Sequence, residues 1–190
     1  MNLPNKLTVL RVLLIPLFVV LVSIPAIPGS KLWAALVFGL ASLTDYFDGH
    51  IARKRDLVTD FGKFMDPLAD KILTTTAIVY MLVDGVCDPI ALLIILAREF
   101  AVAGVRMVAA ADGGKVIAAS FFGKVKTVLQ MVTILAYYLC VGLQQVGAAF
   151  AESYVPQIST YVLMWVVAAV TLLSGVQYIW QNRSFVNTTK

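Results

Sequence analysis

Apolar residues recur in long runs along this chain of 190 residues, separated by short polar stretches. Each run is about 20 residues long, the length at which an α-helix crosses the hydrocarbon core of a bilayer. The runs predict six transmembrane helices, at about residues 7–24, 31–53, 64–83, 89–110, 124–146 and 157–180. We therefore expect an all-α integral membrane protein in which residues 1–190 form a single membrane-embedded domain.

Composition agrees with this expectation, and the placement of charge orients the chain. Hydrophobic residues make up 60% of the sequence, against roughly 45–50% in soluble domains. Of the 15 Lys and Arg residues, only Lys31 falls in a loop assigned to the outer side. The positive-inside rule therefore places both termini and the loops at 54–63 and 111–123 in the cytoplasm. The net charge of +4 thus indicates the cytoplasmic face of the cell membrane, and no nucleic-acid partner is expected.

The N-terminal residues are polar at every third position, at Asn5, Thr8 and Arg11. Such a short segment is expected to lie along the membrane interface and to turn into the bilayer at Pro16. The alternative is a solvated interfacial face, with Lys6 and Arg11 extending to lipid phosphates. Because no small-residue cleavage site follows, we expect the segment to be retained rather than removed as a signal peptide.

Four aspartates lie within otherwise apolar sequence, at Asp45, Asp48, Asp66 and Asp70. A carboxylate at the centre of a membrane helix costs about 3 kcal/mol, so these residues need partners or a wet cavity. At about 100° per residue, the first two share a helical stripe with Gly49 and Ala52, and the last two share another with Gly62. Two helices can therefore turn their carboxylates toward each other, with small residues that allow close approach.

Facing carboxylates repel one another unless cations lie between them. Ligation by oxygen alone suits Mg²⁺ or Mn²⁺, and four carboxylates can hold two ions that clamp a phosphoryl group. We therefore predict a two-metal site. Asp66 by itself, directly before Pro67, would equally suit the N-cap of the third helix.

The spacing D-x2-D-G-x2-A-R-x8-G-x3-D-x3-D, from Asp45 to Asp70, resembles the signature of the CDP-alcohol phosphatidyltransferase family at every fixed position. Members of that family are six-helix membrane enzymes of about this length. The resemblance implies a CDP-alcohol phosphotransferase-like bundle, a homodimer, and transfer of a phosphatidyl group from CDP-diacylglycerol to an alcohol with release of CMP.

The resemblance also implies roles for individual residues. Asp70 would be the general base that takes the proton of the acceptor hydroxyl, in addition to its role as a metal ligand. The opening Pro-Asn-x-Leu-Thr-x-x-Arg is similar to a segment that borders the nucleotide site in the family. The residues implied to bind the nucleotide donor are Asn5, Thr8, Arg11, Asp48, Gly49, Ala52, Arg53 and Gly62.

Charged residues also lie in the fourth predicted span and at the start of the fifth. Arg98 and Glu99 fall in mid-membrane and imply a polar cavity. A direct pair between these two is the weaker alternative, because neighbouring side chains on a helix diverge. We expect a cationic pocket for a phosphorylated second substrate, formed by Arg98, Arg106, Ser120, Lys124 and Lys126. A role in binding lipid headgroups or in topology is the alternative for these residues.

Two stretches, Arg-Glu-Phe at 98–100 and Ser-x-x-Gly-Lys-x-Lys-Thr at 120–127, are similar to the phosphatidylglycerophosphate synthase branch of the family. This similarity implies glycerol 3-phosphate as the acceptor and phosphatidylglycerol phosphate as the product. Another acceptor, serine or an inositol phosphate, stays open, and so does a divalent-cation transporter that uses the same carboxylates.

The remaining features predict structure rather than chemistry. The last span, at 157–180, carries no acidic or basic side chain, and we assign it to packing alone. The two cysteines, Cys87 and Cys140, are interpreted as structural, because two isolated thiols are a poor metal site and a disulfide between them is only one geometric option.

Overall fold

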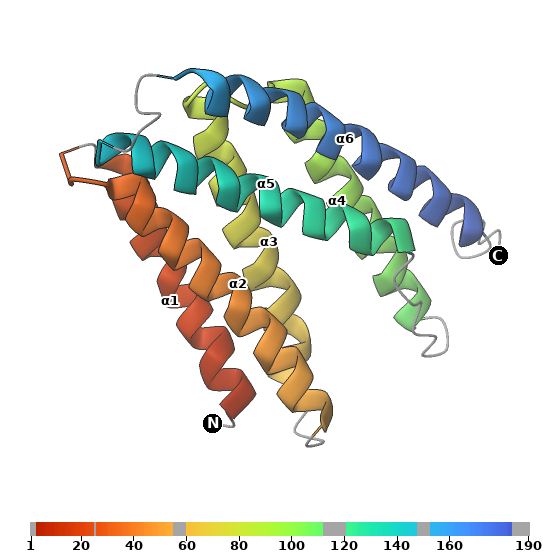
Figure 1. Cartoon of the computed structure of the whole chain (residues 1–190). Helices are drawn as coiled ribbons and strands as arrows, with labels where there is room; N and C mark the ends of the chain where they lie inside the picture. The colour runs from red at the N-terminus through yellow and green to blue at the C-terminus, as the bar shows by residue number, and fades with distance from the viewer. Residues whose placement is uncertain (1–2, 25, 55–59, 112–120, 148–152, 184–190) are drawn as a thin grey trace. The chain divides into compact units, whose positions relative to one another are not determined.

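The computed structural model describes residues 3–24, 26–54, 60–111, 121–147 and 153–183, and every regular element within them is a helix (Figure 1). The six helices are α1 (Leu3–Ser23), α2 (Ser30–Lys54), α3 (Asp60–Val83), α4 (Pro89–Ala111), α5 (Phe121–Gln145) and α6 (Val155–Gln181). Side chains at 3–6, 45–54, 60–64, 66, 67, 110 and 111 lie outside this description. The all-α prediction is confirmed for the described residues.

The helix α1 differs from its prediction because no separate interfacial segment precedes it. It runs without interruption from Leu3 to Ser23, with Pro16 inside it. A proline removes one backbone hydrogen bond, but it does not end a helix that is held on both sides. Ile15 and Phe18 flank Pro16, and both side chains are buried. The turn into the bilayer at Pro16 stays a prediction.

The helix α3 also starts earlier than predicted, at Asp60 instead of near residue 64. An acidic residue at the first position of a helix is stabilised by the positive end of the helix dipole. As a consequence, Asp66 and Pro67 lie inside α3, and Asp66 is not its N-cap. The helices α2, α4, α5 and α6 begin and end within three residues of their predicted limits.

Contacts divide the chain into two compact units, residues 1–80 with 134–156 and residues 81–133 with 157–190. The first unit is centred on aromatic side chains. Phe18 of α1 contacts the rings of Phe38 on α2, at 6.2 Å between centroids, and of Tyr138 on α5, at 5.3 Å. The Tyr138 hydroxyl donates a hydrogen bond of 2.9 Å to the carbonyl oxygen of Ala77 on α3. Four helices of this unit therefore meet at one buried cluster.

The start of α2 is fixed against the end of α5 by a contact between backbones. A Cβ atom added at Gly142 would lie 2.5 Å from Leu32 Cα and closer still to Leu32 N. Nearby, the Gln145 side chain accepts a hydrogen bond of 3.0 Å from the Lys31 backbone N–H. The Lys31 ammonium donates to the Tyr137 hydroxyl at 3.2 Å. Only glycine allows two helices to approach this closely.

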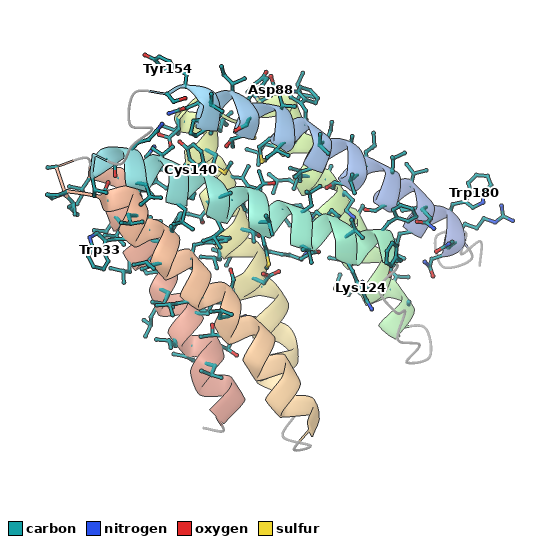
Figure 2. The ribbon with its side chains drawn as sticks, viewed as in Figure 1. Trp33, Asp88, Lys124, Cys140, Tyr154 and Trp180 are labelled. Carbon is teal, nitrogen blue, oxygen red and sulfur yellow. The ribbon has the colours of Figure 1, made fainter. Side chains whose placement is uncertain are left out.

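In the second unit, Asp88 joins the start of α4 to α6 (Figure 2). Its Oδ1 accepts a hydrogen bond of 2.8 Å from the Ile90 backbone N–H and so caps α4. Its Oδ2 accepts a hydrogen bond of 3.2 Å from the Tyr161 hydroxyl. The preceding turn uses the left-handed conformation of Gly85, with φ at 75°, to end α3.

Both cysteines are free thiols, as a structural role requires. Cys87, in the turn before Asp88, is buried. Burial, together with the neighbouring carboxylate of Asp88, raises the pKa of the Cys87 thiol to about 11. A thiol with such a pKa holds almost no thiolate at neutral pH, so Cys87 is inert.

Large apolar side chains are exposed along the helices. Exposed stripes on α1 and α2 consist of Leu10, Leu13, Leu17, Val20, Trp33, Leu36, Leu40 and Leu43. Within the described residues, α5 and α6 are long and apolar enough to cross a membrane by length and composition, with mean hydropathy 1.5 and 1.9. Exposed Trp33 and Trp180 lie in the first turn of α2 and the last turn of α6 (Figure 2), where tryptophans gather at membrane interfaces.

The close approach at Gly142 predicts that Gly142→Ala destabilises the first unit by about 2 kcal/mol or more, because the added methyl group meets backbone that cannot rotate away. Thermal unfolding of the purified protein in detergent measures this. The matched control is Gly104→Ala in α4, where a Cβ meets nothing within 4 Å. It should be neutral or stabilising by up to about 1 kcal/mol. Equal melting temperatures for the two variants would contradict the close contact.

Candidate active site

The four signature aspartates occupy matching positions on two consecutive helices. Asp48 lies six residues before the end of α2, and Asp66 lies six residues after the start of α3. At 1.5 Å per residue, each is about 9 Å from the connection at 55–59. Asp45 and Asp70 lie about one turn further along their helices, again at similar distances from that connection. The backbone therefore brings both pairs to one level, as the spacing predicts.

The helix α1 places two predicted nucleotide-binding residues at the same level. Thr8 lies fifteen residues before the end of α1, and Asp45 lies fifteen residues after the start of α2. These two helices pack against each other and are joined by a short turn at 24–29. Thr8 and Arg11 continue the buried stripe of Ile15 and Phe18. The exposed fraction is 1% for Thr8 and 0% for Arg11. The inward face of α1 thus changes from apolar to polar where the aspartates begin.

This level contains polar groups that a core would not bury without need. A buried guanidinium such as that of Arg11 costs several kcal/mol unless negative charge compensates it. Ser42 lies twelve residues after the start of α2, and Arg11 twelve residues before the end of α1. The Ser42 Oγ is buried and makes no hydrogen bond to any described residue. Buried polar atoms of this kind fit a site that receives a polar ligand.

Asp70 is the one signature aspartate whose side chain is described, and it is half-buried. One turn later, the Thr74 hydroxyl donates to the backbone carbonyl of Asp70 at 2.9 Å. This bond uses the backbone carbonyl of Asp70 and not its carboxylate. A half-buried carboxylate remains accessible to a soluble substrate, as the predicted general base requires.

The donor set fits hard divalent cations, because it consists of carboxylate oxygens alone. The side chains of Asp45, Asp48 and Asp66 lie outside the described part, and no group of three His, Cys, Asp or Glu occurs within it. The two-metal site therefore stays a prediction. The same holds for five further predicted donor-binding residues, whose side chains also lie outside the described part: Asn5, Gly49, Ala52, Arg53 and Gly62.

The second unit contains the predicted acceptor residues that are described, and two of them share one carboxylate. Glu99 Oε1 accepts a hydrogen bond of 3.0 Å from Arg98 Nη1 and one of 2.5 Å from the Lys126 ammonium. The expectation that Arg98 and Glu99 diverge was therefore wrong. The guanidinium arm is long enough to reach the neighbouring carboxylate although the two Cβ atoms point apart. The prediction missed Glu99 as a member of the cluster.

The last helix does more than pack, which corrects its assignment to packing alone. Arg106 Nε donates a hydrogen bond of 3.2 Å to the Tyr178 hydroxyl, and its guanidinium carbon lies 5.6 Å from the centre of that ring. One turn earlier on α6, a Cβ at Gly175 would lie 2.7 Å from Arg98 Cγ. Both arginines of α4, Arg98 and Arg106, therefore contact α6. A tyrosine and a glycine one turn apart in an apolar run were the signal in the sequence.

The other predicted acceptor residues are less constrained. Lys124 is exposed in the first turn of α5 (Figure 2), two residues before the buried Lys126. Ser120 lies outside the described residues. The structure therefore brings Arg98 and Lys126 together through Glu99, and holds Arg106 on Tyr178.

Comparison with known proteins decides the family. The model of the CDP-alcohol phosphatidyltransferase family matches residues 1–179. The chain belongs to the CDP-alcohol phosphatidyltransferase family. The resemblance carried by the aspartate spacing is thus confirmed, and a match over this length includes all six helices of this family member.

Curated relatives cover nearly the whole of this CDP-alcohol phosphatidyltransferase. A protein of Bacillus subtilis is 36% identical over 200 aligned positions, which span 99% of this chain and 98% of the relative. A protein of Rickettsia felis is 41% identical, with 93% of each chain covered. One of Shigella flexneri serotype 5b is 37% identical, with 94% and 93% covered. Each relative is named CDP-diacylglycerol–glycerol-3-phosphate 3-phosphatidyltransferase.

Proposed function

We propose that this enzyme transfers the phosphatidyl group of CDP-diacylglycerol to glycerol 3-phosphate, forming phosphatidylglycerol phosphate and CMP. The observation that carries the proposal is similarity along the full chain to relatives named for this reaction. The aspartate signature at one level of α2 and α3 supports it. A cation transporter is no longer supported, because the family is one of phosphatidyltransferases.

In the reaction, the acceptor hydroxyl oxygen bonds to the phosphorus of the phosphatidyl group, and the bond from that phosphorus to the CMP oxygen breaks. Asp70 takes the hydroxyl proton, and its partly open position suits this role. Asp45, Asp48 and Asp66 together with Asp70 would hold two divalent ions, Mg²⁺ or Mn²⁺. When bound, such ions neutralise the pyrophosphate and stabilise the leaving CMP.

The donor nucleotide is bound in this proposal by the polar stretch of α1 and by small and basic residues of the signature. Thr8 and Arg11 are buried at the level of Asp45 and turn toward the interior of the first unit. Guanidinium groups suit pyrophosphate because they form paired, charge-assisted hydrogen bonds. Arg11 and Arg53 are therefore the cations proposed for the donor.

The acceptor phosphate is assigned to the basic residues of the second unit, Arg98, Arg106, Lys124 and Lys126, with Ser120. Arg106 supports this assignment because its side chain is exposed, yet Tyr178 fixes its direction. An arginine held in this way loses less conformational entropy on binding an anion than a free one does.

All six helices are proposed to cross the cell membrane, with both termini and the active site on the cytoplasmic side. Every helix has at least 21 residues, enough for a bilayer core of about 30 Å. The exposed apolar stripes of α1 and α2 would face lipid. In this arrangement the acyl chains of the donor stay in the bilayer while its nucleotide enters from the cytoplasm. A homodimer, usual in the family, belongs to the same proposal.

The metal site predicts that activity depends on a divalent cation. Asp45→Asn should lower the rate of CMP release by roughly 100-fold or more, because it removes a charged ligand from the site. Asp48→Asn, Asp66→Asn and Asp70→Asn should behave alike, and excess chelator should stop the wild type. Asp84→Asn, at an exposed carboxylate in the turn after α3, is the control and should keep full activity. Wild-type turnover in chelator would rule out the metal site.

The orientation predicts sidedness of labelling. In a variant without Cys87 and Cys140, Gly114→Cys between α4 and α5 should react with a membrane-impermeant maleimide only when the cytoplasmic face is opened. Tyr154→Cys is the control on the opposite side, where Tyr154 is 77% exposed, and it should react in intact cells. The reverse pattern would overturn the topology, which rests on Lys31 being the one basic residue of the 15 that falls in an outer loop.

The acceptor assignment predicts that Arg106→Ala raises the KM for glycerol 3-phosphate by about 10- to 100-fold. This is the effect expected from losing one charge-assisted hydrogen bond to the acceptor phosphate. The KM for CDP-diacylglycerol should change little. Glycerol, which lacks the phosphate, should be a poor acceptor for both proteins. Arg183→Ala, just beyond the end of α6, removes an exposed arginine and should have no effect. Unchanged kinetics in Arg106→Ala, or preference for serine, would make the acceptor assignment wrong.

A further inference from the structure

One carboxylate oxygen holds two cations in the second unit. Glu99 Oε1 accepts from Arg98 Nη1 on the same helix and from Lys126 Nζ on α5. The three side chains are mostly buried, with exposed fractions of 12% for Arg98, 21% for Glu99 and 4% for Lys126. Glu99 thus ties the start of α5 to the middle of α4.

The cluster joins two basic side chains to one carboxylate. Arg98 Nε is also buried and makes no hydrogen bond to any described residue. A buried guanidinium N–H group without an acceptor is unfavourable unless a ligand supplies one. The cluster therefore suits an anionic ligand with several acceptor oxygens, such as a phosphate monoester.

The two cations differ in how firmly the protein holds them. The stem of Arg98 lies against Gly175, where a Cβ would come within 2.7 Å of Arg98 Cγ, so α6 already confines it. The side chain of Lys126 is flexible, with four rotatable bonds. Its ammonium is a compact charge without a preferred plane. Its contact with Glu99 across the two helices restricts the position of the ammonium.

We infer that Glu99 is a positioning residue of the acceptor site, which holds the Lys126 ammonium beside Arg98 so that both face the acceptor phosphate. The inference rests on the proposed function and deepens it. Glu99 does not touch the reacting atoms. It acts through Lys126, whose ammonium it contacts.

Steady-state kinetics of the purified enzyme test this role. Glu99→Gln should raise the KM for glycerol 3-phosphate about tenfold, with kcat and the KM for CDP-diacylglycerol within about twofold of wild type. The effect falls on KM because a phosphate remote from the hydroxyl is held equally in the ground and transition states. Asp84→Asn removes an exposed carboxylate of the same unit and should leave all three constants unchanged. A wild-type KM in Glu99→Gln would overturn the inference.

A double variant separates positioning from a general structural role. If Glu99 acts through Lys126, then Glu99→Gln combined with Lys126→Met should show the KM of Lys126→Met alone, within about twofold. If the two single effects multiply, Glu99 acts independently of Lys126 and the inference is wrong. The double variant also removes the buried ammonium that loses its contact with the Glu99 carboxylate in Glu99→Gln.

Glu99→Asp is the second variant, for use if Glu99→Gln does not fold. It keeps the charge but shortens the side chain by one methylene group, so it should raise the KM for glycerol 3-phosphate by less than Glu99→Gln does, about threefold. An unchanged KM in Glu99→Asp, where Glu99→Gln does not fold, would overturn the inference.

If the wild type releases CMP only with an unphosphorylated alcohol, the proposed function fails and the inference fails with it. If glycerol 3-phosphate is used normally by wild type and Glu99 variants, the inference alone fails.

Discussion

The burial of charge inside apolar helices is the constraint on which this structure depends. Arg11 in the first unit and Lys126 in the second have almost no exposed surface. Each would cost several kcal/mol in an apolar core without compensating charge. Lys126 has that charge in Glu99, while the polar face of α1 lies at the level of the aspartates on α2. The helices thus pack apolar faces together and keep polar stretches for ligands.

The same constraint is visible in where charged residues lie along the helices. The helices α5 and α6 keep long apolar stretches and qualify as spans by length and composition. In contrast, α2 carries Asp45 and Asp48, α3 carries Asp66 and Asp70, and the middle of α4 carries a pair of opposite charges. The charged residues lower the hydropathy of the helices that carry them.

Sequence predicted the helices well where apolar runs alone define them, as in α2, α4, α5 and α6. It placed the starts of α1 and α3 four residues too late, because polar residues precede each apolar run and the helix includes them. The level of the four aspartates followed from spacing, since helical rise is constant. The partners of Glu99 and Tyr178 could not be predicted, because they depend on the rotamers of long side chains and on which helices become neighbours.

The two tight glycines differ in how freely their surroundings can change over evolution. At Gly175 the neighbouring atom belongs to the stem of Arg98, which a change of rotamer could move aside. At Gly142 the neighbour is the backbone of α2 at Leu32, and no exchange of side chains on α2 can make room for a Cβ. A larger residue at Gly142 therefore has no compensating partner mutation. The spacing between α2 and α5 is therefore set by backbone against backbone, whereas the contact at Gly175 depends on the rotamer of one long side chain.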